Sequence, residues 1–445
     1  MLCTLCSGEW SLLPIDIPGP ACHEPAEFFW PVYCRHFPTV SRLSAPNSSI
    51  PDARPASDWP LIICLGLVAA LAPLSVDMYL PSFSAIAAEF GASAAQIQLT
   101  LSGYMIGFTL GQLAYGPLSD RFGRKYVLLS GITLYVAMTI LCATAVDAET
   151  LAVYRFFQAI GGGAGTVLSR AIIRDRYDGA QMARVMSLML TIILFAPMIA
   201  PVIGGYVLIW FGWRAVFWTL VFFGTLAIFV VVFGIRESLP PERRSTPGFK
   251  PILRGYADVL AHRQAIGYIL TGGITFGALF AFLSGAPFVF IDFYGVAPEH
   301  LGFIFTLNVL GVMAGGWVNS KLVVTEGVFQ MFKVGVWLLF AGAVALFALI
   351  ATNVWGMWGV ILGIVFFTLP LSLINANAAA GALEYFPKNA GTASAVVGSV
   401  RYGCGAVSGI CVGLLHDGTP MPMGWVILGC AGLSVVFLIT LLRQR

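Results

Sequence analysis

Apolar stretches about twenty residues long follow one another from Trp59 to the end of the chain, separated by short polar breaks. A helix of this length crosses the roughly 30 Å hydrocarbon core of a bilayer and satisfies its own backbone hydrogen bonds there. We place twelve such spans, with approximate bounds 60–82, 97–117, 126–146, 150–171, 184–209, 214–235, 265–291, 300–320, 331–352, 355–376, 390–415 and 423–442. The sequence therefore predicts an all-α integral membrane protein with twelve transmembrane helices.

Charged residues are too few for a water-soluble chain of this size. Only 10% of the 445 residues are Asp, Glu, Lys or Arg, whereas a soluble domain has roughly 25%. The net charge of +3 is too small to indicate a nucleic-acid partner. We therefore expect the lipid bilayer and a small-molecule substrate as partners, no nucleic acid, and a monomer.

The longest polar break, residues 236–263, divides the predicted spans into six and six. It predicts two six-helix bundles, residues 59–237 and 264–445, joined by a cytoplasmic linker at 238–263. Residues 1–58 are rich in proline and lack a helical period, so we interpret them as a disordered tail.

Basic residues set the orientation, because Lys and Arg accumulate in cytoplasmic loops. With the N-terminus inside, only Arg214 of the 24 Lys and Arg residues falls outside, while Arg155 and Arg401 fall within spans. The distribution predicts that both termini are cytoplasmic.

The segment Gly116–Lys125, GPLSDRFGRK, follows the second predicted span. It resembles the signature loop of the major facilitator superfamily. The residues that carry the resemblance are Gly116, Asp120, Arg121, Gly123, Arg124 and Lys125. Glycines permit a tight turn between helices, the acid can pair with a neighbouring helix end, and the bases hold the loop inside. The resemblance implies a role in conformational switching, and an ordinary basic loop is the alternative.

The fifth predicted span contains APMIAPVIGG at residues 196–205. Pro197, Pro201, Gly204 and Gly205 are similar to the proline–glycine motif of the antiporters in this superfamily, although alanines replace the glycines that usually precede the proline. A kinked packing helix is the alternative interpretation.

The first predicted span contains LSVDMYLP at residues 74–81, and Gln98, Tyr104 and Gln112 follow in the second. Together these residues resemble the twelve-span drug:proton antiporters, closest to the Bcr/CflA subfamily. The resemblance covers residues 59–445.

Two charges in the predicted spans are candidates for proton coupling. Asp77 lies about 27 Å along the first span, and Arg155 lies about 7 Å from the outer end of the fourth, so both are expected in the outer half of the membrane. An ionised group in hydrocarbon persists only when it is paired, hydrated or protonated. We expect Asp77 to face Arg155 and to exchange a proton, with a static ion pair as the alternative.

A third intramembrane charge, Arg401, has no acid at its depth. It is expected either to meet an anionic substrate or to pair with a carbonyl or with Asn308. Our candidates for the substrate cavity are Tyr79, Tyr104, Gln158 and Arg401.

The sequence contains no Walker motif, no Ser–His–Asp arrangement and no metal-ligand spacing, which argues against an enzyme or an ATP-driven pump. We expect no metal and no cofactor beyond protons as the coupling ion. The resemblance implies proton-coupled efflux of small, largely apolar drugs or metabolites across the inner membrane by alternating access. A proton-linked importer of a sugar, peptide or organic acid, and a non-transporting receptor or scaffold, are the alternatives.

Overall fold

The structure is a computed structural model that describes residues 59–244, 249–387 and 389–442. The predicted tail, residues 1–58, lies outside these ranges. The described residues form helices and contain no β-strand. The helices that precede the polar break are α1 (Trp59–Asp77), η1 (Leu80–Ser82), α2 (Phe83–Phe90), α3 (Ala94–Phe122), α4 (Arg124–Ala143), α5 (Ala148–Arg176), α6 (Gly179–Phe211) and α7 (Trp213–Gly234).

The polar break contains the short η2 (Pro241–Arg243) and the helix α8 (Phe249–Ala261). The helices that follow are α9 (Arg263–Pro287), η3 (Phe288–Phe293), α10 (Pro298–Glu326), α11 (Val328–Thr352), α12 (Gly356–Thr368), α13 (Leu371–Glu384), α14 (Ala390–Leu414) and α15 (Met421–Leu441).

Every predicted span coincides with one helix or with two consecutive ones. The tenth span is interrupted between α12 and α13, where Pro370 has no N–H to continue the ladder of helix hydrogen bonds. The first span is interrupted after Asp77, where α1 ends before the short η1 that contains Pro81. The interruption of the first span matters for the site, because the end of α1 leaves the backbone carbonyls of its last turn without a partner in the helix.

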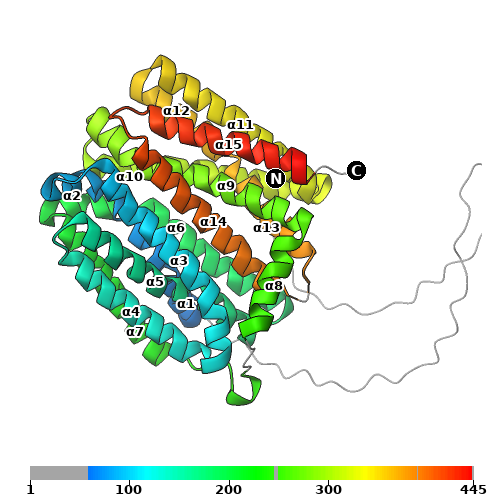
Figure 1. Cartoon of the computed structure of the whole chain (residues 1–445). Helices are drawn as coiled ribbons and strands as arrows, with labels where there is room; N and C mark the ends of the chain where they lie inside the picture. Colours follow the sequence, from blue (N-terminus) through cyan, green and yellow to red (C-terminus); the bar gives the residue numbers. More distant parts are fainter. Residues whose placement is uncertain (1–58, 245–248, 388, 443–445) are drawn as a thin grey trace, which may run out of the picture. The chain divides into compact units, whose positions relative to one another are not determined.

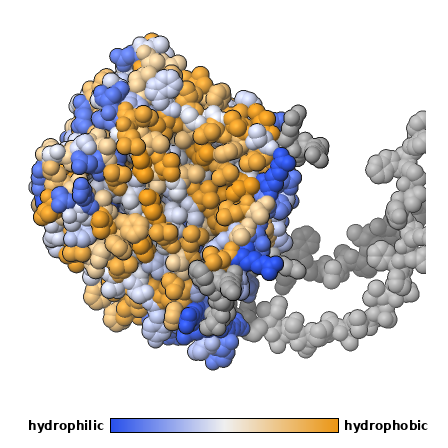
Figure 2. All heavy atoms as spheres, in the orientation of Figure 1, coloured by the Kyte–Doolittle hydropathy of each residue, from blue (hydrophilic) through white to orange (hydrophobic). Residues whose placement is uncertain are grey.

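Ten helical segments of the described chain are long and apolar enough to cross a membrane. The two predicted spans that fall short are α3 and α5, which carry polar residues such as Gln98, Gln112 and Arg155 along buried faces. Figure 2 shows apolar residues across the middle of the visible face, while hydrophilic residues gather toward its margins. The apolar surface is therefore the one that lipid is suited to cover.

The helices before and after the polar break pack mainly within their own set. In the first set, α5 contacts α3, α4 and α1, while α7 packs on α4. In the second, α9 contacts α14, α15 and α13 (Figure 1). The two sets meet along α3 with α14 and along α6 with α10. A ligand site between the two sets would therefore lie among these four helices and their neighbours.

The helix α8 of the polar break packs against α14 and α9. The hydroxyl of Tyr256 on α8 donates a hydrogen bond to the carbonyl of Leu113 on α3, over 3.2 Å. This helix therefore connects the break to both sets near the end of the bundle where α3 meets α4.

Candidate functional site

A cavity of about 540 Å³ lies where the two sets of helices meet. Its wall comes from α1, α3, α5 and α6 of the first set and from α9, α10 and α14 of the second. The volume falls within the range of small-molecule sites, which are mostly apolar with a few placed polar groups. Three charged side chains line it, namely Asp77, Arg170 and Arg401. We call it the central cavity.

An aromatic wall forms one side of the central cavity. The ring of Tyr402 on α14 lies 4.5 Å from that of Phe108 on α3 and 5.1 Å from that of Phe276 on α9, measured between centroids. Phe276 in turn lies 4.9 Å from Phe280. The edge-on and tilted geometries are those in which aromatic pairs attract one another. The wall therefore offers a continuous apolar surface that spans both sets.

Arg401 is a predicted cavity residue, and the structure places it in the cavity lining. Its guanidinium carbon lies 4.2 Å from the centroid of the Phe276 ring, a cation–π contact. Among the described residues it donates no hydrogen bond and joins no ion pair, and its Nε is buried without a partner. The predicted pairing with Asn308 or a carbonyl is therefore absent, although Asn308 lines the same cavity with its own Oδ1 unpartnered.

Arg170 also lines the cavity. The predicted orientation instead counted it among the basic residues on the cytoplasmic side. Its Nε donates to the carbonyl of Thr166, one turn earlier in α5, over 3.1 Å. The remainder of the side chain is exposed in the central cavity and also borders a second cavity beside it. Arg170 therefore stands where the two cavities adjoin.

Asp77 lines the central cavity at the end of α1 and is 7% exposed. The three ion pairs of the described chain do not include it, and it accepts no hydrogen bond from a described residue. The predicted ion pair with Arg155 is therefore wrong. Asp77 instead presents its carboxylate to the cavity, where a proton or a ligand can reach it.

Arg155 is fully buried and is held by groups other than Asp77. One terminal nitrogen donates to the carbonyl of Ser75 over 3.0 Å and to Oε1 of Gln158 over 2.9 Å. Its guanidinium carbon lies 4.4 Å from the ring centroids of both Tyr79 and Tyr104. We call these five residues the Arg155 cluster.

The end of α1 explains why Arg155 binds backbone rather than carboxylate. The carbonyls of the last helical turn have no partner within the helix, and Ser75 is two residues from the end of α1. The predicted similar depth of Asp77 and Arg155 is thus correct, but the arginine meets the carbonyl two residues before the acid.

The other predicted cavity residues divide between the cavity and the Arg155 cluster. Tyr104 belongs to both, since it lines the cavity and stacks on Arg155. Tyr79 and Gln158 are fully buried and do not line the central cavity, so their predicted place in its wall is wrong. Gln158 donates to Oγ1 of Thr139 over 2.8 Å, which fixes the amide that receives Arg155.

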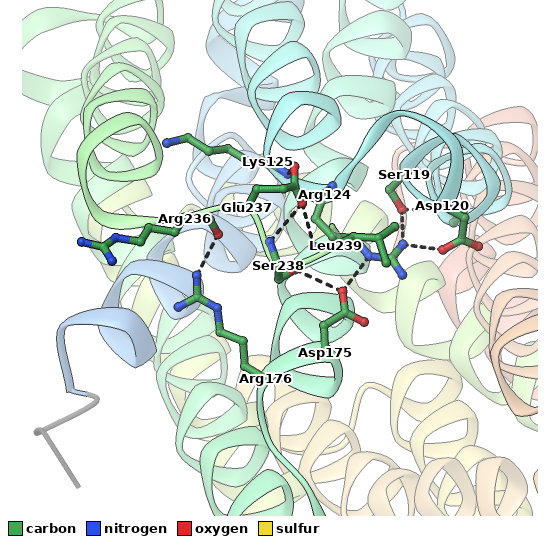
Figure 3. A network of polar contacts seen from close by, with 11 residues as sticks. Ser119, Asp120, Arg124, Lys125, Asp175, Arg176, Arg236, Glu237, Ser238 and Leu239 are labelled. Atoms are coloured by element: carbon green, nitrogen blue, oxygen red, sulfur yellow. Dashed lines mark hydrogen bonds and ion pairs between the residues drawn. The ribbon is translucent and has the colours of Figure 1, made fainter. Parts of the chain in front are cut away.

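The signature segment is mostly helical, because α3 continues to Phe122 and α4 begins at Arg124. Arg124 forms ion pairs with Asp120, over 2.6 Å, and with Asp175 at the end of α5, over 2.9 Å (Figure 3). Its side chain is 11% exposed and also donates to Oγ of Ser119 over 2.6 Å. Arg124 therefore ties the end of α3 and the start of α4 to the end of α5.

Glu237, just after α7, completes this network. Its carboxylate accepts the backbone N–H groups of Arg124 and Lys125, over 2.9 and 3.1 Å, at the N-terminus of α4 (Figure 3). Negative charge is favourable at that end of a helix. Gly123, the residue between α3 and α4, has φ +97°, and a Cβ there would lie 2.6 Å from Glu237 Oε2. The glycine therefore makes both the turn and the contact with Glu237 possible.

Three predicted residues of the segment have more local surroundings. Gly116 lies inside α3, where an added Cβ would meet nothing within 4 Å, so its predicted role in a tight turn is wrong. Arg121 lies 5.1 Å from the ring of its neighbour Phe122. The Nζ of Lys125 donates to the carbonyl of Val232 at the end of α7, over 2.8 Å.

The second cavity, of about 480 Å³, lies at this end of the bundle. Gly116, Asp120 and Arg124 line it, and so does Arg170. The second cavity therefore borders the central cavity at Arg170, on the side of the signature segment.

The proline–glycine motif of α6 lies at the opposite end. Pro197 lines the central cavity. Gly204 lies directly against the carbonyl of Met78 just after α1, and a Cβ on Gly205 would lie 2.8 Å from the Cα of Glu299 on α10. Pro201 is buried one turn before these glycines. The two glycines let α6 pack closely against the residue that follows α1 and against α10 of the second set, which closes the bundle at this end.

The sequence contained a signal for some of the residues that it left out of the site. Tyr402 follows Arg401, and Asn308 is a polar residue within a predicted span. Arg170 lies one residue before the predicted inner end of its span, whereas α5 continues to Arg176. The place of Arg170 in the cavity wall could have been predicted only if the depth of the second cavity were known.

Comparisons with known proteins agree with this architecture. The family description "Major Facilitator Superfamily" matches residues 65–409. A bicyclomycin resistance protein homolog of Haemophilus influenzae is 35% identical over 85% of this chain and 95% of that protein. The MFS-type transporter YdgK of Bacillus subtilis is 32% identical over 86% of this chain and 96% of that protein. The multidrug resistance protein MdtL of Escherichia coli is 29% identical over 53% of this chain and 59% of that protein.

Solved structures share the fold at low sequence identity. A D-xylose-proton symporter superposes with a TM-score of 0.69 at 15% identity, covering 86% of this chain and 97% of that one. The nucleoside transporter NupG superposes with a TM-score of 0.67 at 14% identity, covering 86% of this chain and 99% of that one.

Proposed function

Because the chain belongs to the major facilitator superfamily, a family of membrane transporters and not of enzymes, we propose that it exports small, largely apolar drugs or metabolites in exchange for protons. The names of two relatives support this direction, since one is a bicyclomycin resistance homolog and another a multidrug resistance protein. Protons serve as the coupling ion, and no other cofactor is needed.

The observation that carries the proposal is a carboxylate in the wall of a large apolar cavity. Asp77 is accessible to the central cavity and has no basic partner among the described residues. A carboxylate in such surroundings gains or loses a proton according to what occupies the cavity. Asp77 is therefore our candidate for the proton carrier. Arg155 acts on it indirectly, because it holds the end of α1 from which Asp77 projects.

The organisation that we propose has twelve spans in two six-helix bundles, residues 59–237 and 264–445, with residues 238–263 as linker. The helices α3 and α5 supply the two spans that are less apolar, since their buried polar faces are shielded from lipid by the other helices. The chain would lie in the inner membrane as a monomer, with both termini in the cytoplasm and without a nucleic-acid partner.

The contacts at the two ends of the bundle support alternating access. The end at Gly205 is closed by the packing of α6 on α10, while the second cavity borders the central one at Arg170, toward the signature segment. With the signature segment in the cytoplasm, this arrangement corresponds to an inward-open state. The network around Arg124 would break and re-form as the bundles rock against each other.

A resistance assay, followed by a transport assay in membrane vesicles, tests the proposal. Cells with and without the chain are compared on a panel of antibiotics that includes bicyclomycin. A compound to which the chain gives resistance is then added to inverted membrane vesicles with an acidic interior. We expect the compound to accumulate inside, because protons leave as it enters. Accumulation in right-side-out vesicles with an acidic exterior would instead establish the importer, and no proton-driven movement in either preparation would favour the receptor or scaffold.

A further inference from the structure

We propose that the exported compound carries an ionised acidic group, a carboxylate or a sulfonate, and that Arg401 and Arg170 hold this group in the central cavity. The inference rests on the proposed function, since it assumes that the central cavity is the transport site, and it defines the chemical class of the substrate.

Arg401 forms no hydrogen bond or ion pair with a described residue. Two other arginines have protein acceptors: Arg155 donates through one terminal nitrogen to a carbonyl and an amide, and Arg124 pairs with two carboxylates. Arg401 has only the face of Phe276, and its Nε is buried without a hydrogen bond. A charge in the membrane interior is costly unless something compensates it. A ligand acid would supply the missing charge and acceptors.

Basic side chains outnumber acidic ones in the wall of the central cavity. Arg401 and Arg170 outnumber Asp77, the only carboxylate among the residues that line it. The wall therefore carries a net positive charge when Asp77 is ionised, and a larger one when it is protonated. In an apolar cavity such a field favours an anion over a neutral compound of the same shape.

The two arginines come from different sets of helices. Arg170 belongs to α5 and Arg401 to α14, so an acid bound by both would touch both sets of helices. Guanidinium groups bind planar acids through paired donors, which orients the ligand as well as attracting it. The unpartnered Oδ1 of Asn308 adds an acceptor for an N–H or O–H on the ligand.

Aromatic rings form much of the remaining wall of the central cavity. Phe276, under Arg401, continues into Phe280, and Phe305 lines the cavity as well. An aromatic body attached to the acid would stack on these rings while the acid meets the arginines. The substrate class is therefore an amphipathic organic acid with an aromatic or similarly apolar body.

A matched pair of dyes tests this class. 1-Anilinonaphthalene-8-sulfonate carries a sulfonate, and N-phenyl-1-naphthylamine is the same body without it. Binding of each is measured by equilibrium dialysis against the full chain in nanodiscs of zwitterionic phosphatidylcholine, with empty nanodiscs as background. We expect the sulfonate to bind about tenfold more tightly than the neutral dye, as hydrogen bonds to charged groups allow.

Substitution of each arginine tests whether that residue binds the sulfonate. Arg401→Gln is expected to weaken binding of the sulfonate about tenfold, with a comparable loss for Arg170→Gln and little change for the neutral dye. Retained binding of the neutral dye shows that each variant is folded. Lys321→Gln is the matched control, since Lys321 is an exposed base over the ring of Trp317, outside the cavity lining. It should leave both dyes unchanged.

Equal affinity of the wild type for the two dyes would overturn the proposal. So would an Arg401→Gln variant that binds the sulfonate normally or that loses both dyes equally. Asp77→Asn separates this proposal from the proposed function, because it should abolish proton-driven export while binding of the sulfonate is kept or strengthened. If Asp77→Asn still exports with protons, the proton-coupling mechanism fails while the acid site stands.

Discussion

Arg155 and Arg401 are both arginines within predicted spans, yet their surroundings differ in kind. Arg155 is fully buried among a carbonyl, an amide and two tyrosine rings, all supplied by the protein. Arg401 lines a cavity and has one aromatic ring and no hydrogen bond among the described residues. Both charges must be compensated in a membrane. The fold gives Arg155 two hydrogen bonds through one terminal nitrogen, although its Nε and its other terminal nitrogen are buried without a partner. Arg401 has no hydrogen bond among the described residues and is available to a ligand.

The contrast separates a positioning residue from a binding residue of the same type. Arg155 fixes the end of α1 and thereby the place of Asp77, without entering the cavity. Arg401 makes a cation–π contact with Phe276 and places its charge in the wall of the cavity. Loss of Arg155 should therefore damage the fold, whereas loss of Arg401 should alter selectivity.

The largest expected effect is that of Arg155→Met. The substitution leaves the carbonyl of Ser75 without the donor from Arg155, and leaves Oε1 of Gln158 with only the weak thiol donor of Cys142, over 3.9 Å. We therefore expect a loss of about 2–5 kcal/mol in the free energy of unfolding. Transport of acidic and neutral compounds should fall together. Unfolding in mixed micelles with increasing sodium dodecyl sulfate measures the first effect. A fully stable variant would mean that Arg155 is not held by the fold as described.

An intermediate effect is expected at the signature segment. Arg124→Ala removes two ion pairs, with Asp120 and Asp175, near the membrane surface. Because Arg124 lines the second cavity and not the central one, we expect binding affinity to change little while turnover falls about tenfold. Arg121→Ala is the matched control, because Arg121 contacts only the ring of Phe122 in the described chain. Comparable slowing in both variants would remove the special role of Arg124.

The smallest effect on stability is expected for Arg401→Gln. Only a cation–π contact is lost, so the free energy of unfolding should change by no more than about 1 kcal/mol. The same unfolding assay in mixed micelles applies. A loss as large as that of Arg155→Met would erase the difference between the two arginines.

The sequence predicted the helices well, because each apolar stretch has one way to cross lipid and satisfy its backbone. It also offered Arg401 as a candidate for the cavity wall, with pairing to a carbonyl or to Asn308 as the alternative, and it predicted that Asp120 pairs with a neighbouring helix end. The break at Pro370 was not predicted, because whether a proline interrupts a span depends on its neighbours.

The partners of the charges were harder to predict. The ion pair of Asp77 with Arg155 was expected from equal depth, but depth does not say whether a side chain points to the acid or to a carbonyl near it. Glu237 was placed in the polar break with no partner assigned, although it binds the N-terminus of α4 from more than a hundred residues away. Such contacts depend on how helices turn about their axes, which a single sequence does not encode in its periodicity.

The central claim, that Asp77 carries the exchanged proton, is tested most directly by proton movement itself. Inverted vesicles that contain the wild type, Asp77→Asn or Asp292→Asn are given an acidic interior, and the decay of the pH gradient is followed on addition of a compound to which the chain gives resistance. Asp292 is an exposed carboxylate at a helix end and serves as the matched control. The account predicts rapid decay for the wild type and Asp292→Asn and no added decay for Asp77→Asn. Decay in Asp77→Asn as fast as in the wild type would contradict it.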